Sequence, residues 1–251
     1  MDIVNKLNRI FLSQDREKGR CYLDELERYK SAARSYSLVE GTVSVLSDMH
    51  TNASYIYYGR FARVLGLKHP SGEGAIPSIW EKHILDLIPR EDLYGKYLEE
   101  LRFYNFVKRL PRKQRSDYCW VSKLRMRTTS GDTVWVCHRL FYVPDPFNNT
   151  LWLALCLYSP LSFDWPGGGR AVELATGQVV ELGSRSNGKI LTDREIQVLR
   201  LIDKGLMSKQ IADTLSISVN TVSRHRQEIL AKLQVKNSIE ACRVAQDLGL
   251  I

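Results

Sequence analysis

Four short runs of apolar residues at helical spacing fill the C-terminal segment 191–251. The first run opens with Thr192 and Glu195, which have the spacing of a capping box, and Gly205 follows it as a typical C-cap residue. The later runs open on residues that commonly cap helices: Ser208, Ser218 and Ser238. The pattern predicts an all-α domain of four helices, the third of which spans about 219–233.

The third predicted helix carries hydrogen-bond donors and cations on the face away from its apolar stripe. A short helix, a tight turn and a longer cationic helix form the geometry that lays one helix in the DNA major groove. Side chains near the start of such a helix reach base edges, and others hold phosphates. We predict base contacts from Ser223, Arg224 and Gln227, and backbone contacts from Lys209, Thr221 and His225. Arg224 is the strongest candidate, because a guanidinium can bind guanine through two hydrogen bonds. The outer face of this helix also includes Lys232.

Periodicity alone also fits a helical bundle whose charged face is merely solvated. Segment 191–251 holds nine Lys or Arg and seven acidic residues, so its net charge of +2 does not identify a DNA-binding domain. The residue order is more specific, and it resembles the LuxR/NarL-type helix-turn-helix family through the following motifs: Leu191-Thr192-x-Arg194-Glu195-x-x-Val198-Leu199, Gly205-x-x-Ser208-Lys209-Gln210-Ile211-Ala212, Leu215-x-Ile217-Ser218-x-Asn220-Thr221-Val222 and Lys232-Leu233-x-Val235.

This resemblance implies a transcription regulator that binds double-stranded DNA as a homodimer, with the fourth helix often forming part of the dimer contact. One position departs from the family pattern. Many members carry Lys directly after the Thr-Val pair, where this chain has Ser223 followed by Arg224. The departure concerns which base sequence is read, not whether DNA is bound.

The front half alternates strand-like and helix-like runs. Helical runs are expected at 60–65, 79–88 and 93–110, between the second and third strands. The five runs rich in β-branched and aromatic residues are Thr42–Ser47, Ala53–Tyr58, Tyr118–Arg127, Thr133–Val143 and Leu151–Tyr158. Two strands, several helices and three antiparallel strands are the order of a PAS domain.

Local motifs are similar to the PAS family as well: Leu46-x-Asp48, Tyr55-Ile56-Tyr57-Tyr58, Leu65-Gly66 and Ile88-Pro89-x-Glu91-Asp92-Leu93. The resemblance implies a five-stranded antiparallel sheet with a pocket under its helices, used for ligands, cofactors or partner contacts. The predicted fold class is therefore α+β: a PAS-like domain followed by the four-helix helix-turn-helix domain.

The domain boundaries follow from composition. Residues 1–36 form an N-terminal helical segment that either caps the sheet or pairs with a second copy; we favour pairing. Residues 37–165 form the PAS-like domain and residues 166–190 a hairpin and polar linker. Residues 191–251 form the DNA-binding domain.

No cofactor can be named from the sequence. The cysteine motif that attaches flavin in light-sensing relatives is absent, and His83, alone on its helix, is more typical of a packed or solvated residue than of a haem ligand. Four aromatic residues could line a pocket, although core packing is the commoner role: Tyr55, Tyr57, Trp120 and Trp135. The five cysteines show no CxxC spacing, and Cys137 and His138 are strand neighbours that point to opposite faces, so we expect reduced, packed thiols without metal.

Segment 102–127 holds nine Lys or Arg and one acid, so its net charge of +8 equals that of the whole chain and the remaining residues sum to zero. A solvated strand face and loop explains this best. An auxiliary contact to the DNA backbone or a docking surface for an acidic partner would also fit. We predict that neutralising Arg112, Lys113 and Arg115 leaves DNA affinity within about a factor of two, because the helix-turn-helix carries the binding.

The leading functional hypothesis is a cytoplasmic, dimeric transcription regulator that is not an enzyme and does not span a membrane. Its front domain responds to a small-molecule ligand, or alternatively acts as a ligand-free module for protein interaction. The chain shows no nucleophile–base pair, phosphate loop or metal-ligand spacing that would favour an enzyme. It also lacks the paired early acids and parallel βα alternation of a receiver domain.

Overall fold

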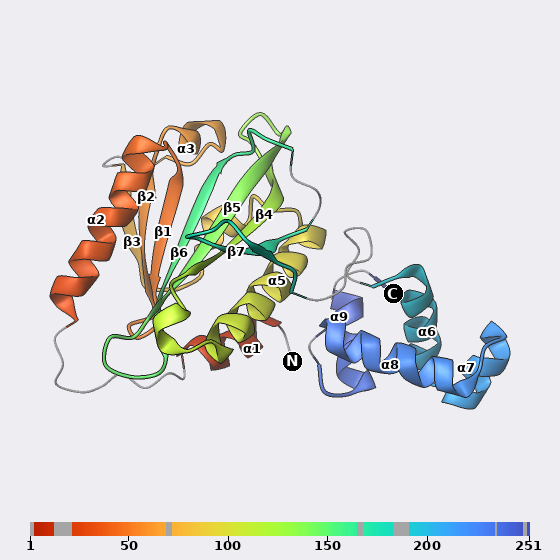
Figure 1. Ribbon diagram of the computed structural model, residues 1–251. Coiled ribbons are helices and arrows are strands. Elements are labelled where there is room, and N and C mark those ends of the chain that lie inside the picture. The colour runs from red at the N-terminus through yellow and green to blue at the C-terminus, as the bar shows by residue number, and fades with distance from the viewer. Residues whose placement is uncertain are drawn as a thin grey trace. The chain divides into compact units, whose positions relative to one another are not determined.

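Figure 1 shows the computed structural model of the chain. It describes residues 3–12, 22–68, 72–164, 168–182, 191–233, 235–247 and 250–251. The chain divides into two compact units, of which one spans residues 7–183 and the other comprises residues 1–6 and 184–251. The polar linker predicted at 184–189 lies outside the described residues. Among the helices described, none combines the length and the apolar character needed to cross a membrane.

The first unit is built on one antiparallel sheet with the order β3-β2-β1-β6-β5-β4-β7-β8. Its strands are β1 Val43–Asp48, β2 Ala53–Tyr58, β3 Glu73–Ile76, β4 Tyr118–Arg127, β5 Thr133–Pro144, β6 Leu151–Pro160, β7 Arg170–Glu173 and β8 Val179–Val180. The five predicted strands are all present and adjacent, so the α+β class is confirmed. The predicted strand number is wrong, because short strands extend both edges of the sheet.

Of these edge strands, β7 and β8 were predicted from the sequence and β3 was not. The predicted hairpin at 171–182 is present as β7 and β8, and pairing of β7 with β4 adds it to the sheet. Strand β3, with the sequence Glu-Gly-Ala-Ile, has neither the length nor the apolar alternation that predicts a strand. It exists because the exposed edge of β2 offers backbone groups that pair with it.

Helices cover both faces of this sheet. They are α1 Ile3–Leu12, α2 Leu23–Val39, α3 Phe61–Val64, α4 Lys82–Leu85, α5 Arg90–Arg109 and the 3-10 turn η1 Arg112–Gln114. Alternation along the strands separates the faces: Leu46 and Leu155 pack with α2, whereas their neighbours Ser47 and Cys156 face the layer that contains α5. The sheet therefore has one face under α2 and another under α1, α4 and α5 (Figure 1).

The second unit consists of four helices, as predicted: α6 Asp193–Asp203, α7 Ser208–Leu215, α8 Val219–Leu233 and α9 Ser238–Asp247. The capping box of Thr192 and Glu195 is confirmed, and Gly205 adopts a positive φ of 82° after α6. Ser208 and Ser238 are the first helical residues rather than caps. Helix α7 is capped by the Gln210 side chain on the amide of Met207, and α9 by Asn237, whose side chain accepts from the amide of Glu240.

Candidate functional site

The link between α7 and α8 is a tight turn closed by backbone and side-chain bonds. Ser216 ends α7 in the left-handed conformation, with φ 52° and ψ 48°. Two residues later the Ser218 hydroxyl accepts from the amide of Thr221 at 3.0 Å, which caps α8. The predicted sequence of short helix, tight turn and longer helix is therefore present, and it fixes which face of α8 points outward.

The six predicted DNA-contacting residues lie on the surface of this pair of helices. Lys209, Ser223, Arg224 and Gln227 are exposed, whereas Thr221 and His225 are half-buried. The Thr221 hydroxyl is also engaged locally, 2.8 Å from the Ser218 hydroxyl. The α8 residues form an outward surface of donors, which is the chemistry that base edges and phosphates require.

Glu228 is a member of this surface that sequence reasoning overlooked. Its carboxylate accepts from Arg224 Nε at 2.8 Å, and it lies 3.6 Å from His225 Nδ1. The hydrogen bond with Arg224 lowers the pKa of Glu228 and raises that of Arg224. The signal was available, since an Arg and a Glu four residues apart on a helix are within reach of each other. Any DNA contact by Arg224 has to compete with this pair.

The outer face of α8 is less cationic than the sequence suggested, because two of its cations hold the bundle together. Lys232 was expected on the outer face; instead its ammonium lies 2.7 Å from Glu195, whose side chain is 1% exposed. Arg226 donates to the Ser238 hydroxyl at 3.3 Å and to the Leu206 carbonyl at 3.5 Å. Of the three Lys and Arg residues in α8, only Arg224 is exposed.

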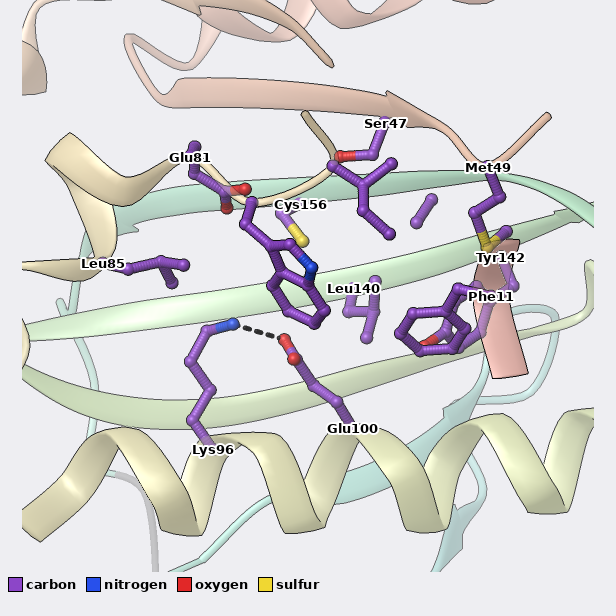
Figure 2. A pocket seen from close by; sticks show the side chains of 13 residues that line it. Phe11, Ser47, Met49, Glu81, Leu85, Lys96, Glu100, Leu140, Tyr142 and Cys156 are labelled. Carbon is purple, nitrogen blue, oxygen red and sulfur yellow. Dashed lines mark hydrogen bonds and ion pairs between the residues drawn. The ribbon is translucent and has the colours of Figure 1, made fainter. Parts of the chain in front are cut away.

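The first unit contains a second candidate site, a buried polar cluster between α5 and the sheet. Lys96 and Glu100 are one helical turn apart on α5, and both side chains point toward the strands (Figure 2). Their charged groups lie 2.6 Å apart, with side chains only 4% and 6% exposed. Burying charges in this way is costly unless they are paired, so each of these two groups depends on the other.

Further polar groups surround this ion pair. Glu81 is 4% exposed and accepts from the Tyr158 hydroxyl at 3.1 Å. The fully buried ring of His138 stacks on Tyr158, with 5.0 Å between centroids. His138 Nδ1 lies 3.3 Å from the Ser122 hydroxyl, and its Nε2 lies 3.8 Å from Glu100. These groups come from the segment before α4, from α5 and from three strands, so only the fold brings them together.

Burial sets the protonation state of this polar cluster. Burial lowers the pKa of His138 well below its ordinary value, and the Lys96 ammonium lowers it further, so the imidazole is neutral. Burial also opposes the charged form of Lys96, but Glu100 and the other acidic groups around it outweigh burial and raise the Lys96 pKa. Glu81 has its pKa raised, mainly by burial. The cluster therefore holds a stable cation beside a neutral imidazole.

The polar cluster borders a cavity of about 40 Å³. Its lining includes the aromatic residues Phe11, Trp80 and Tyr142 and the charged residues Lys96 and Glu100. Figure 2 shows the Lys96 and Glu100 side chains rising from α5 toward the sheet. A space of this size holds one or a few water-sized groups. The cavity thus brings aromatic side chains and charged groups together between α5 and the sheet.

None of the aromatic residues proposed from the sequence lines this cavity. Tyr55 and Tyr57 pack on the α2 face of the sheet, Trp120 is 2% exposed beside Phe103, and Trp135 is 50% exposed. His83 lies on the surface with its Nε2 2.9 Å from the Tyr58 hydroxyl. The strand pattern identified aromatic residues correctly but did not show which face of the sheet α2 covers.

The basic stretch 102–127 contains arginines that hold the fold together. Arg115 is 3% exposed and donates to the carbonyls of Lys108, Leu110 and Asn149 at 2.8–3.1 Å. Arg112 donates to the carbonyl of Asp145 at 2.7 Å, and Arg125 to the Asp92 carboxylate at 2.6 Å. Only Arg115 is buried among the nine basic residues of this stretch, so the solvated surface predicted from the sequence does not describe it. The exposed members are Lys108, Arg109, Arg112, Lys113 and Arg127.

Comparison with known proteins places the tail in a family. Residues 189–245 match the family described as "Bacterial regulatory proteins, luxR family". The oxygen regulatory protein NreC of Staphylococcus aureus is 39% identical over 83 residues, which cover 30% of this chain and 38% of NreC. The chain thus spans well under half of the relative it matches.

Solved structures align over more of the chain but only loosely. The Vibrio cholerae VqmA dimer, solved in the absence of target DNA, aligns at 14% identity with a TM-score of 0.31, covering 91% of this chain and 88% of that one. Escherichia coli SdiA aligns at 14% identity with a TM-score of 0.24–0.25, covering 99–100% of this chain and 97% of SdiA. Alignments this loose establish no correspondence between sites.

Proposed function

The C-terminal tail of this chain is a LuxR-family helix-turn-helix domain, and from this we propose that the protein is a homodimeric, sequence-specific regulator of transcription whose PAS-like unit senses a signal. In this proposal the partner of the tail is double-stranded DNA and the protein acts in the cytoplasm. The observation that carries the proposal is the outward surface of α8, where Ser223, Arg224 and Gln227 are exposed together after a capped, tight turn.

Residue roles follow from position and chemistry. Ser223, Arg224 and Gln227 read base edges, and Arg224 contributes most because its guanidinium matches the acceptors of guanine. Lys209, Thr221 and His225 contact the phosphate backbone. Because Lys232 and Arg226 are engaged inside the bundle, one tail offers few free cations, and binding of two half-sites by a dimer compensates for this.

The signal enters through the polar cavity of the first unit. The buried ion pair lies beside this cavity, and a ligand that bonds to Lys96 or Glu100 would compete with the bond between them. Such a ligand would be small, given a cavity of about 40 Å³, unless the surrounding side chains move. The two tails would then be presented differently to half-sites about one helical turn apart.

A selection from random DNA followed by binding measurements tests the proposal. We expect a sequence-preferring complex and a palindromic site. Arg224→Ala should lower affinity by about ten- to a hundredfold and flatten the preference at one base pair. The matched control is Lys204→Ala, which removes one exposed charge at the end of α6 and should change affinity by less than about threefold. A protein that enriches no sequence would contradict the proposal.

Sensing and dimerisation need a measurement other than the selection from random DNA. Native mass spectrometry of the purified full-length chain reports the mass of the assembly and of any retained small molecule together. We expect the mass of two chains. A monomer that nevertheless binds a palindromic site with high affinity would contradict the proposed dimer, while DNA binding would stand.

A further inference from the structure

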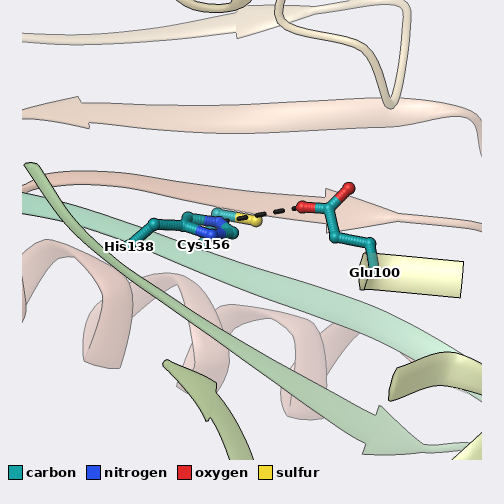
Figure 3. A group of neighbouring side chains, drawn as sticks. All are labelled: Glu100, His138 and Cys156. Carbon is teal, nitrogen blue, oxygen red and sulfur yellow. Dashed lines mark ion pairs between the residues drawn. The ribbon is translucent and has the colours of Figure 1, made fainter. Parts of the chain in front are cut away.

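Three potential metal ligands meet in the buried polar cluster, and we propose that Glu100, His138 and Cys156 form a site for a borderline-soft divalent cation such as Zn²⁺. The donors come from α5, β5 and β6, and Figure 3 shows the carboxylate facing the imidazole and thiol across a short gap. Thiolate, imidazole and carboxylate are the three donor types that zinc uses in proteins. This site goes beyond the proposed regulation of DNA and does not depend on it.

The register of the sheet explains how His138 and Cys156 come together. His138 pairs with Tyr158 and Leu140 pairs with Cys156, so both donors lie on the α5 face of adjacent strands, two residues apart in register. Cys137, the neighbour of His138 in the sequence, points to the opposite face and packs with Cys119 and Val121. The expectation that the cysteines have no metal role considered neighbours along the chain and could not include this cross-strand pairing.

The distances are close to those of a coordinated ion. The three donor atoms lie within 4.8 Å of one another, and His138 Nε2 is 3.8 Å from Glu100 Oε1. Tetrahedral zinc, with bonds of about 2.0–2.3 Å, keeps its ligand atoms about 3.3–3.8 Å apart. A contraction of about 1 Å or less among the three donor atoms would therefore complete the site.

The imidazole is oriented for coordination. Its Nδ1 lies 3.3 Å from the Ser122 hydroxyl, which fixes the ring, and its Nε2 faces Glu100. Within the described part of the chain this buried Nε2 makes no hydrogen bond. A fully buried ring nitrogen without a bond is uncommon, and a metal ion at this point would satisfy it.

The fourth ligand position falls at the cavity. Glu100 and Cys156 both line this space of about 40 Å³, which has room for one coordinated water. Three protein ligands and one open position form the coordination that zinc adopts where it binds an exchangeable ligand. Coordination replaces the thiol proton of Cys156, which is released to solvent.

Lys96 opposes the ion, which makes the proposal sharply testable. Its ammonium lies 2.6 Å from Glu100 Oε1, so a bound cation would share this carboxylate with a second positive charge. Removing the ammonium by Lys96→Met should therefore tighten divalent-cation binding by about tenfold. A purely structural role for Lys96 predicts the opposite trend, since loss of its contacts would loosen the site.

The experiment is a Co²⁺ titration of the full-length protein after removal of metal with a chelator. We expect about one ion per chain and a thiolate-to-cobalt absorption band. The band should disappear in Cys156→Ser and in His138→Gln. It should persist in Cys137→Ser, the matched control, whose thiol lies on the other face of the same strand.

Circular dichroism accompanies each variant to establish that it is folded. Should Cys156→Ser fail to fold, His138→Gln and Cys137→Ser decide together: the band should be lost in the first and kept in the second, and any other result would overturn the proposal. Uptake without that band, uptake well below one ion per chain, or a folded Cys156→Ser protein that keeps the band would each overturn the proposal.

Discussion

The two units of this protein contain the same pair of charges in opposite environments. In α5, Lys96 and Glu100 are four residues apart and only 4% and 6% exposed. In α8, Arg224 and Glu228 have the same spacing but are 78% and 36% exposed. The same spacing therefore gives a buried ion pair in the first unit and an exposed ion pair on α8 of the second unit.

The difference between these pairs lies in what water does to them. Water and salt screen the attraction between two exposed charges. Arg224 can therefore leave Glu228 for a base or a phosphate at little cost in free energy. A buried pair cannot lose one member without leaving an uncompensated charge in a medium of low polarity. The first unit buries its pair beside a small cavity, and the second exposes its pair on the surface that we propose contacts DNA.

The largest expected effect comes from breaking the buried pair. Glu100→Gln keeps the size of the side chain but leaves the Lys96 ammonium without its counter-charge. We expect the free energy of unfolding to fall by about 3–5 kcal/mol, measured by urea denaturation at neutral pH in the presence of a chelator.

Asp86→Asn is the matched control, since Asp86 pairs with Lys82 at the same spacing on the surface. It should change the free energy of unfolding by about 0.5 kcal/mol or less. Equal effects at the two positions would show that burial does not distinguish the pairs. In the double variant Lys96→Met/Glu100→Leu much of the stability should return, because no charge remains buried.

The spacing of Lys96 and Glu100 can be read from the sequence, and the predicted helix 93–110 agrees closely with α5, Arg90–Arg109. The burial of these two side chains could not be predicted from the sequence, because it depends on strands β5 and β6, some forty to sixty residues further along the chain. The helix-turn-helix surface is different. Its six residues lie within nineteen positions, from Lys209 to Gln227, so local pattern and family motifs were enough to propose it.

The same reasoning explains the corrections elsewhere. Strand β3 and the aromatic lining of the cavity depend on contacts between distant segments, for which periodicity contains no signal. Lys232 has the position of an outward residue on α8, yet it turns to Glu195, which the capping box of α6 had already buried. Sequence periodicity predicts the element on which each residue lies, whereas contacts between distant segments determine the partner of its side chain.

Cysteine reactivity tests whether burial acts alike in both units. Burial raises the pKa of Cys119 in β4 to about 11, and burial with the nearby Asp203 raises that of Cys242 in α9 to about 11. At pH 8 the thiolate fraction of each is then about a hundredfold below that of a thiol with a pKa near 9. We expect correspondingly slow modification of the folded protein by a thiol reagent, with sites mapped by mass spectrometry.

Modification of these two thiols should accelerate as the pH rises toward 11, and should be fast at pH 8 in guanidinium. If Cys242 reacts rapidly in the folded protein while Cys119 does not, the second unit opens more readily than the first. That outcome would show that the two units differ in how readily they open as well as in how deeply they bury charge.

A smaller effect is expected from removing the acid that competes for Arg224. Glu228→Gln eliminates a negative charge next to the proposed DNA surface and frees the guanidinium. We expect DNA affinity to rise by about two- to fivefold, more at low salt than at high salt, measured by fluorescence anisotropy. Glu240→Gln, a charge-matched change on α9, should have less effect. Weaker binding in Glu228→Gln would instead show that the pair positions Arg224 for the groove.

The smallest effect is expected in the basic stretch, and the structure changes how it must be tested. Neutralising Arg115 would remove three hydrogen bonds to carbonyls and destabilise the first unit, so a loss of DNA binding would be ambiguous. The exposed residues Arg109 and Lys113 avoid this difficulty. In the Arg109→Gln/Lys113→Gln protein we expect DNA affinity within about a factor of two of wild type across a salt series, because these charges do not belong to the helix-turn-helix surface. A loss of tenfold or more that grows as salt falls would place this part of the first unit in the DNA footprint, and the division between a unit that hides charge and one that displays it would no longer hold.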